Sequence, residues 1–236
     1  MDAELSGAVA RLRMYGCWAQ IPALLRGEED TFCTRLALAA AEVERSDFTE
    51  RDWDAAAVAM AAATEAAGTD AERAEAACER AMFCYAQTVF AGVDRAARAR
   101  QALAEAETLA GEDSPLAPML AFRRGLITEN LDGDNDSARQ YYARAHEVAE
   151  RAGDEYTLAF TIRHFAILDH KAGRIDLARQ GFVRSLELRE KVGFLIGMAP
   201  ALSGLARVTD EPEASRLRAE SRRWVRALGL ATRLAQ

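Results

Sequence analysis

Eight side chains in two stretches of the chain have the types and spacing needed to bind an anion. Six of them form two sets with the spacing i, i+4, i+7, namely Arg123, Ile127 and Asn130, and Arg163, Ile167 and His170. This spacing puts the members of each set on one face of a helix. Arg124 and His164 flank the two faces. Because a guanidinium donates two parallel hydrogen bonds to a carboxylate, the arginines could hold a carboxylate, a peptide C-terminus or an acidic side group.

The same arginines also allow a purely structural interpretation. They could pair with Glu129, Asp169 or neighbouring acids and serve solubility instead of binding. Acidic residues recur with one period, at positions 129, 147, 150, 169, 187 and 190, and we interpret them as structural helix surfaces. Both interpretations of the arginines remain open from the sequence.

Catalytic chemistry has little support in the sequence. His164 and His170 lie six residues apart, which is about 240° around a helix axis, so they cannot converge on one metal or substrate. The segment 146–150 resembles a His-Glu-x-x-His zinc helix, but its last position is Glu150. No Gly-x-Ser-x-Gly elbow occurs. The sequence therefore predicts a protein that is not an enzyme, with no catalytic residue, no metal and no cofactor.

The candidate residues belong to a repeat with a period of forty residues. Its clearest copies are 119–153 and 159–193, in which Arg123, Gly133 and Ala138 match Arg163, Gly173 and Ala178. Such a repeat is typical of stacked helical hairpins, because one hairpin cannot bury its apolar stripe alone.

Turns between the two helices of a hairpin are predicted near Arg51, Gly92, Gly133 and Gly173. Five residues after each point comes an alanine, with residues four and seven further along on the same helical face. A shortened unit over about 195–230 is expected to cap the array. Residues 4–25 are expected to form one or two further helices, interrupted near Gly16 and Pro22, and residues 111–118 to form a loop.

The composition of the 236 residues favours an all-α protein. Half of the residues are apolar, many of them alanine, and no alternating strand pattern occurs. The net charge of −7 and the pI near 5.2 argue against a nucleic-acid partner. Basic residues cluster in one C-terminal segment, which we interpret as a solvated helix face, and they are Arg216, Arg218, Arg222, Arg223 and Arg226.

Neither a secretory signal nor a membrane span is expected. The N-terminus is acidic and no apolar stretch of sufficient length follows. The cysteines, Cys17, Cys33, Cys78 and Cys84, lack metal-site spacing and are interpreted as small buried hydrophobic residues. We therefore expect a cytoplasmic protein.

The second half of each clear repeat resembles a tetratricopeptide repeat. The matching positions read Ala178-x-x-x-Phe182-x-x-Ser185-Leu186 after Gly173, and Ala138-x-x-x-Tyr142-x-x-Ala145 after Gly133. In the first half, Ile162, Phe165 and Ala166 take the places of the family's Trp, Leu and Gly, and Asp169 stands where tyrosine is usual. The period exceeds the usual one of about 34. Repeats of about 40 are similar to the sensor arrays of bacterial LuxR-type and antibiotic-regulatory transcription factors.

This resemblance implies a right-handed superhelical solenoid of about five hairpins with an N-terminal helical addition, as one domain over 1–236. The candidate arginine faces would line its concave groove. The expected function is a regulatory protein-protein interaction module that binds an extended peptide or partner protein there. The alternative is a sensor of a small anionic effector that signals to a separate partner. Self-association as a homodimer is left open.

The alanine-anchored stripe makes a prediction about stability. Phe182 follows Ala178 by four residues, so it should fill the space that the small residue leaves between hairpins. Replacing it, Phe182→Ala, should lower the free energy of unfolding by about 3–5 kcal/mol in chemical denaturation. A loss below about 1 kcal/mol would place Phe182 on the surface instead.

Overall fold

The computed structural model describes residues 1–111 and 114–236, and within these it contains helices and no strand. The all-α prediction is therefore confirmed. The α-helices are α1 (Ala3–Met14), α2 (Ile21–Leu24), α3 (Phe32–Thr49), α4 (Trp53–Ala66), α5 (Asp70–Phe90), α6 (Ala96–Ala110), α7 (Ala117–Asn130), α8 (Asn135–Ala152), α9 (Glu155–Lys171), α10 (Ile175–Val192), α11 (Met198–Ala206) and α12 (Glu213–Leu228). Three short 3-10 helices are η1 (Trp18–Gln20), η2 (Leu195–Gly197) and η3 (Thr232–Ala235).

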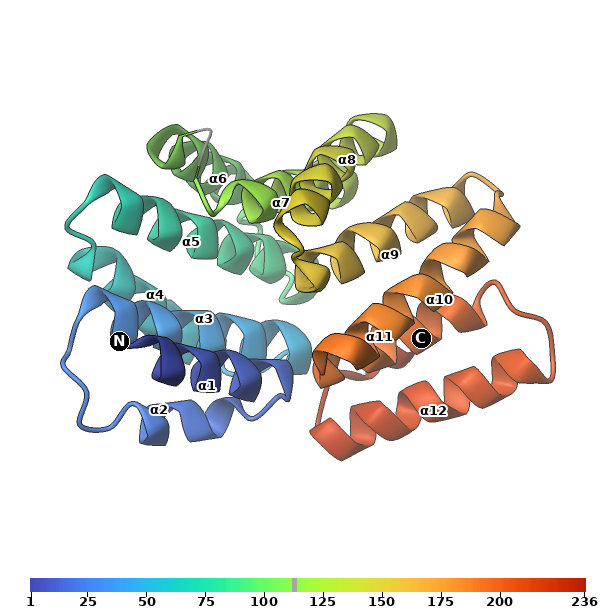
Figure 1. Ribbon diagram of the computed structural model, residues 1–236, viewed down its shortest axis with the longest axis horizontal. Helices are drawn as coiled ribbons and strands as arrows, with labels where there is room; N and C mark the ends of the chain where they lie inside the picture. The colour runs from blue at the N-terminus through green and yellow to red at the C-terminus, as the bar shows by residue number, and fades with distance from the viewer. Residues whose placement is uncertain (112–113) are drawn as a thin grey trace.

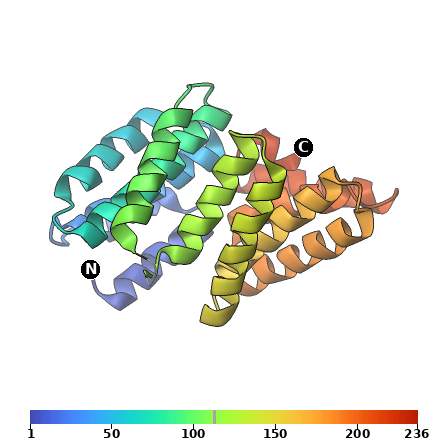
Figure 2. The same ribbon diagram turned by 90° about the horizontal axis from the view of Figure 1, so that it is seen from above.

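Ten of the helices form five hairpins in which consecutive helices pack against each other: α3–α4, α5–α6, α7–α8, α9–α10 and α11–α12. The four predicted turns, near Arg51, Gly92, Gly133 and Gly173, are confirmed between the helices of the first four hairpins. Seen from above, successive hairpins are turned relative to one another, so that the chain follows a curve (Figure 2). The first helix of each hairpin contributes to the inside of this curve, and among the second helices α10 also reaches it, through Arg189. In Figure 1, α6 and α12 lie at the periphery of the molecule.

The turns use different residues to reach the left-handed backbone region. Gly92, Gly133 and Gly173 have φ values of 69°, 73° and 74°, which glycine adopts without steric cost. At the α3–α4 turn, Glu50 and Asp52 take this conformation with φ values of 57° and 59°. Non-glycine residues adopt it rarely, so this turn is held by its surroundings.

Small residues let the helices approach closely, and one large ring fills each gap. Ala138, Ala178, Tyr142 and Phe182 are all buried, which confirms the predicted stripe. The ring of Tyr142 on α8 lies directly against Gly125 on α7, and a Cβ at position 125 would be 2.6 Å from its Cδ1. Because no side chain of any size fits there, Gly125 sets the distance between the two helices of this hairpin.

The two ends of the chain meet and close the curve. Val9 of α1 and Trp18 of η1 share a buried cluster with Ile196 of η2, Val225 of α12 and Leu230. In Figure 1, α1 and α12 lie along the same edge of the molecule. The array is therefore closed by contacts between its first and last elements.

Two expectations from the sequence, for Pro22 and for Cys33, need correction. Pro22 does not interrupt a helix; it lies in the first turn of α2, where its missing N–H has no partner to lose. Gly16, with a φ of 74°, does end the preceding helical segment. Cys33 is exposed, unlike the buried Cys78 and Cys84, so the cysteines do not share one environment.

The predicted loop over 111–118 is placed in part. Helix α6 ends at Ala110 and α7 begins at Ala117, while residues 112–113 lie outside the described residues. Within the part of the chain that is described, no helix has both the length and the apolar character needed to cross a membrane.

The close approach of α7 and α8 predicts a large effect for one added methyl group. Gly125→Ala should lower the free energy of unfolding by about 1–3 kcal/mol, because the new Cβ would collide with the buried Tyr142 ring. The control is Gly7→Ala in α1, whose nearest neighbour would be the flexible Arg11 Nη1 at 3.7 Å. This change should stabilise the helix by up to about 1 kcal/mol. Equal effects of the two changes in urea denaturation would contradict the packing argument.

Candidate functional site

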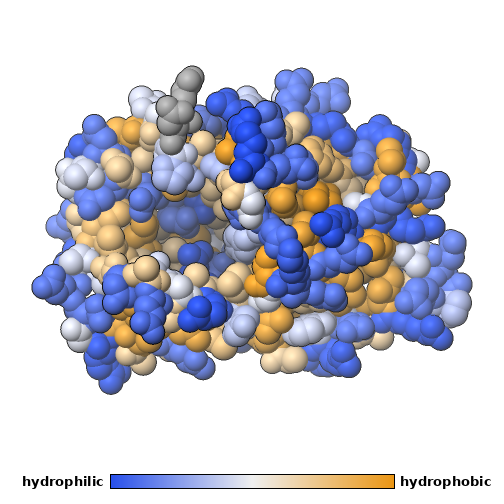
Figure 3. Space-filling view, in the orientation of Figure 1, coloured by the Kyte–Doolittle hydropathy of each residue, from blue (hydrophilic) through white to orange (hydrophobic). Residues whose placement is uncertain are grey.

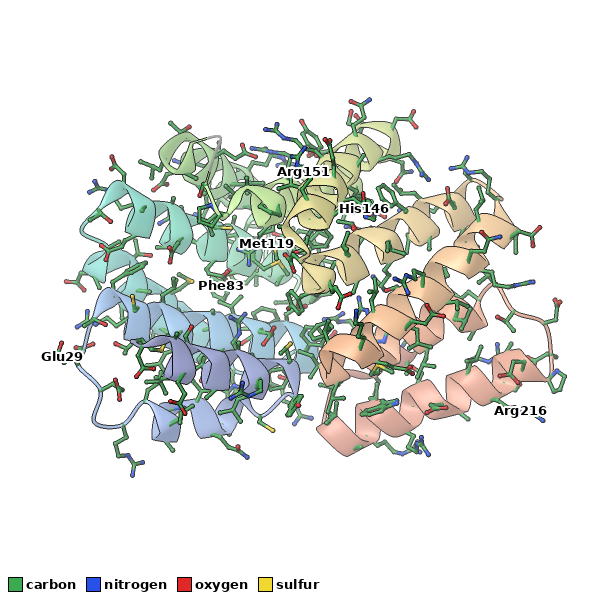
Figure 4. The ribbon with its side chains drawn as sticks, viewed as in Figure 1. Glu29, Phe83, Met119, His146, Arg151 and Arg216 are labelled. Atoms are coloured by element: carbon green, nitrogen blue, oxygen red, sulfur yellow. The ribbon has the colours of Figure 1, made fainter. Side chains whose placement is uncertain are left out.

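The inside of the curve is a cavity of about 770 Å³. The first helix of every hairpin, α3, α5, α7, α9 and α11, contributes to its wall, together with α1, the C-terminal η3, Arg189 of α10 and Phe194 before η2. In Figure 3 the surface is hollowed between α3 and α5, where the cavity reaches this face of the molecule. Figure 4 shows Met119, which lines the cavity, toward the centre of the molecule, whereas Glu29 and Arg216 lie at its periphery. The site is thus a recess between the hairpins that is partly open to solvent.

Aromatic rings form a continuous part of the wall. The ring of Phe160 on α9 lies 5.4 Å from Phe122, 5.0 Å from Tyr156 and 5.2 Å from Phe194, measured between ring centroids. These distances are typical of favourable aromatic pairs. Three flexible methionines, Met14, Met82 and Met119, line other parts of the wall. Such a surface favours an apolar ligand that the thioether side chains can adjust to.

A buried carboxylate holds α7, α8 and α9 together. Glu129 Oε2 accepts hydrogen bonds from the Tyr142 hydroxyl at 2.7 Å and from His164 Nδ1 at 2.9 Å, while Oε1 accepts one from Lys171 Nζ at 2.7 Å. Because a carboxylate can only accept, Nδ1 of His164 carries the proton. Glu129 is 5% exposed, so the interpretation of this residue as part of an outer helix surface is wrong.

The network fixes the charges of its members. Burial raises the pKa of Glu129, but the hydrogen bonds from His164, Lys171 and Tyr142 outweigh it and lower the pKa to about 2. Burial lowers the pKa of His164, which Glu129 opposes without reversing. At neutral pH the network therefore contains an ionised carboxylate and a neutral imidazole.

Two further ion pairs lie in the wall at the N-terminal side. Arg13 Nε of α1 lies 3.3 Å from Glu44 Oε2, which also accepts a hydrogen bond from Trp18 Nε1 at 2.9 Å. Arg123 Nη2 on α7 lies 2.6 Å from Glu79 Oε1 on α5. Each pair joins two helices and leaves little free charge at its place in the wall.

Arg233 fastens the C-terminal segment over the cavity. Its Nη2 lies 2.9 Å from Asp47 Oδ1 and its Nε lies 2.5 Å from Glu50 Oε1, both at the end of α3. Its guanidinium carbon also lies 3.5 Å from the centroid of the Phe90 ring. Burial raises the pKa of Asp47 to about 6, although Arg233 opposes the shift.

The sequence-predicted residues on α7 lie in three different environments. Arg123 and Asn130 line the cavity. Arg123 is only 9% exposed and is paired with Glu79. Asn130 donates a hydrogen bond to the Leu126 carbonyl of its own helix. Ile127 is 2% exposed in the core, so its expected place on the inner face is wrong. Arg124 pairs with Glu107 and is not part of the cavity wall.

On α9, three of the four residues predicted from the sequence line the cavity. Arg163, His164 and Ile167 line it, whereas His170, one turn beyond Ile167, does not. Arg123 and Arg163 thus share one cavity, as their spacing suggested, but Arg163 does not form an ion pair with any described residue while Arg123 does. The pairing of Arg163 with Glu129 or Asp169 that the structural interpretation allowed is not observed.

Most of the wall was not predicted from the sequence, including three charged residues that decide its electrostatics: Glu129, Arg189 and Arg233. For two of these residues, Arg189 and Glu129, the repeat pattern of the sequence did contain an indication. Arg189 occupies the register position of Ala149, so a charge replaces a methyl group in a buried stripe. Similarly, Tyr142 matches Phe182, and its extra buried hydroxyl requires an acceptor, which is Glu129. Nothing in the repeat pattern pointed to Arg233.

The remaining polar clusters offer no second site. His146 Nδ1 lies 2.9 Å from Thr161 Oγ1, and no group of three or more histidine, cysteine, aspartate or glutamate side chains in the described residues could hold a metal ion. The basic residues of α12 include Arg216 and Arg223, which pair with glutamates of the same exposed helix.

Comparison of the protein with models of protein families, with curated proteins and with solved structures finds no match. The resemblance to tetratricopeptide repeats therefore stays a prediction, and the geometry of the cavity has to carry the functional argument.

The Glu129 network predicts loss of stability in acid. The unfolded chain binds a proton at His164 below its ordinary pKa of 6.5, but the buried ring resists protonation, so the contribution of His164 to stability is lost as the pH drops below about 6.5. Asp47, whose pKa burial raises to about 6, contributes in the opposite direction over part of the same range. Glu129 adds a second loss as the pH falls from 4.5 toward 2, because its pKa is lowered in the folded chain.

Urea denaturation between pH 7.5 and 5 measures the first of these losses. His164→Gln, which keeps a donor for Glu129 but does not titrate, should remove this loss, so that lowering the pH destabilises the variant less than it destabilises the wild type. His170→Gln on the same helix is the control and should keep the wild-type slope. Identical slopes for wild type and His164→Gln would exclude His164 as the source.

Proposed function

We propose that the protein is a sensor that binds a small, largely apolar molecule in the central cavity and signals its presence to a separate partner. One observation carries the proposal: a cavity of about 770 Å³ is walled by the first helices of all five hairpins. This volume lies within the range of small-molecule sites, roughly 300–1,000 Å³. Aromatic and methionine side chains supply apolar contact, and a few buried charges supply orientation.

The position of the cavity supports a sensor more than a protein that only stores its ligand. A ligand there would touch every hairpin at once, so it would favour one relative placement of the hairpins over others. A partner that contacts the outer helices could then distinguish the two states. In this proposal the hairpins are tetratricopeptide-like units of a right-handed superhelix, joined at its ends.

The expectation of an extended peptide in a concave groove has less support. An extended peptide needs a passage along the array, whereas the C-terminal segment packs against α3 and α1 and itself forms part of the cavity wall. Binding of a partner protein remains part of the proposal, but on the outside of the array.

Filling the cavity tests this function. The probe is N-phenyl-1-naphthylamine, a neutral dye whose fluorescence rises in apolar surroundings, and the wild-type protein should bind it at one saturable site. Ile167→Trp adds a large ring at a residue that lines the cavity and should weaken dye binding at least about tenfold, since the lost contact area is worth over 1.4 kcal/mol.

The matched control is Val58→Trp, because Val58 is 72% exposed on α4 outside the cavity. It should leave dye affinity unchanged. Failure of the wild-type protein to bind the dye, or equal weakening by both tryptophans, would refute a ligand site in the cavity.

A further inference from the structure

The charges in the cavity wall do not cancel. Four carboxylates line it, and each is paired with a different cation: Glu44 with Arg13, Glu79 with Arg123, Asp47 with Arg233, and Glu129 with Lys171. Two guanidinium groups of the wall, those of Arg163 and Arg189, have no carboxylate partner within the described residues. An acidic protein therefore has a cavity with an excess of positive charge.

Arg189 is held rigidly and still has donors to spare. It is 2% exposed, its Nη1 donates to the Gly197 carbonyl at 2.7 Å, and its Nε donates to Ser185 Oγ at 3.3 Å. Its guanidinium carbon lies 5.0 Å from the centroid of Phe160 and 5.1 Å from that of Phe194. The two acceptors and the two rings carry no net charge, so they fix the position of the guanidinium without neutralising it, and no described group accepts from Nη2.

The guanidinium of Arg163 has fewer hydrogen-bond partners than that of Arg189. Its Nε is buried without a hydrogen-bond partner, and no described group accepts a hydrogen bond from its guanidinium. Glu129 is near enough to influence its charge, but both oxygens of that carboxylate are already occupied by Tyr142, His164 and Lys171. The residue as a whole is half-buried, so its guanidinium is accessible from the cavity, while its buried Nε lacks the partner that buried donors in native proteins almost always have.

The positive charge of Arg163 acts on Arg189. Burial lowers the pKa of Arg189 to about 9, and the positive charge of Arg163 acts in the same direction. Such repulsion across one cavity is relieved by an anion that binds between or beside the two groups.

We propose that Arg163 and Arg189 bind the oxyanion head group of the ligand, which makes the ligand an amphipathic anion whose apolar part lies against the aromatic wall. This inference rests on the small-molecule function proposed above and names the chemical class of the molecule. It also moves the anion site from the Arg123–Arg163 pair expected from the sequence to Arg163 and Arg189, because Glu79 already occupies Arg123.

Displacement of the neutral dye separates the two proposals. Decanoate, decyl phosphate and 1-decanol share one alkyl group and differ in the head group. At least one of the two anions should displace the dye from the wild-type protein at a concentration about tenfold or more below that of decanol, as expected for charge-assisted hydrogen bonds. The more effective anion identifies the head group.

Arg163→Met is the decisive variant, since methionine keeps an apolar stem of similar length without the unpaired charge. It should bind the dye as wild type does and lose most of the preference for the anion over decanol. Its thermal unfolding temperature without ligand should not fall, because the replaced group makes no hydrogen bond to any described residue. Arg189→Met should also lose the preference, with some loss of stability from its contacts to Gly197 and Ser185.

Arg124→Met is the matched control, because Arg124 lies next to Arg123 on α7, pairs with Glu107 and does not line the cavity. It should keep the wild-type preference. Equal displacement by anions and decanol in a wild-type protein that binds the dye would overturn this inference and leave the proposed function standing. A wild-type protein that does not bind the dye would refute the proposed function and this inference together.

Discussion

The packing of the C-terminal segment against α3 is the contact on which the cavity depends. The backbone N–H of Ala231 donates to the Phe48 carbonyl at 2.7 Å, and Arg233 binds Asp47 and Glu50 of the same helix end. Without these contacts the first helices would line a groove open along its length. Their partners lie more than 180 residues apart in the sequence, so they form only once the whole array is folded.

The closure also explains the unusual α3–α4 turn. Glu50 holds a left-handed conformation that non-glycine residues rarely adopt, and its carboxylate is the acceptor for Arg233. Glycine at this position would relieve the strain of the left-handed backbone conformation, but it would remove the carboxylate that binds Arg233. Backbone strain in the turn is therefore tolerated where the side chain is needed to hold the two ends of the protein together.

Packing and electrostatics meet at Tyr142. Its ring fills the space beside Gly125, and its hydroxyl reaches Glu129 on the same facing helix, α7. Tyr142 thus sets the distance between α7 and α8, and its hydroxyl is one of the donors that bind the ionised carboxylate of Glu129. Because Glu129 is saturated by its own donors, it does not neutralise Arg163, and the positive excess of the cavity follows from how the helices pack.

The sequence alone determined the helices, the turns and the buried stripe of this protein. These features depend on residues a few positions apart: Gly133 and Gly173 end one helix, and Ala178 and Phe182 share a face because an α-helix has 3.6 residues per turn. The forty-residue period also correctly brought Arg123 and Arg163 to one cavity.

Only the tertiary structure decided which side of each helix faces inward and what each charge meets there. Helices α7 and α9 repeat in sequence, yet Ile127 is in the core while its counterpart Ile167 lines the cavity. The rotation of a helix about its axis is fixed by its neighbours, and a difference of one residue, about 100°, changes a cavity position into a core position. The partners of Arg123, Arg163 and Arg233 come from other hairpins or from none, and no local pattern specifies them.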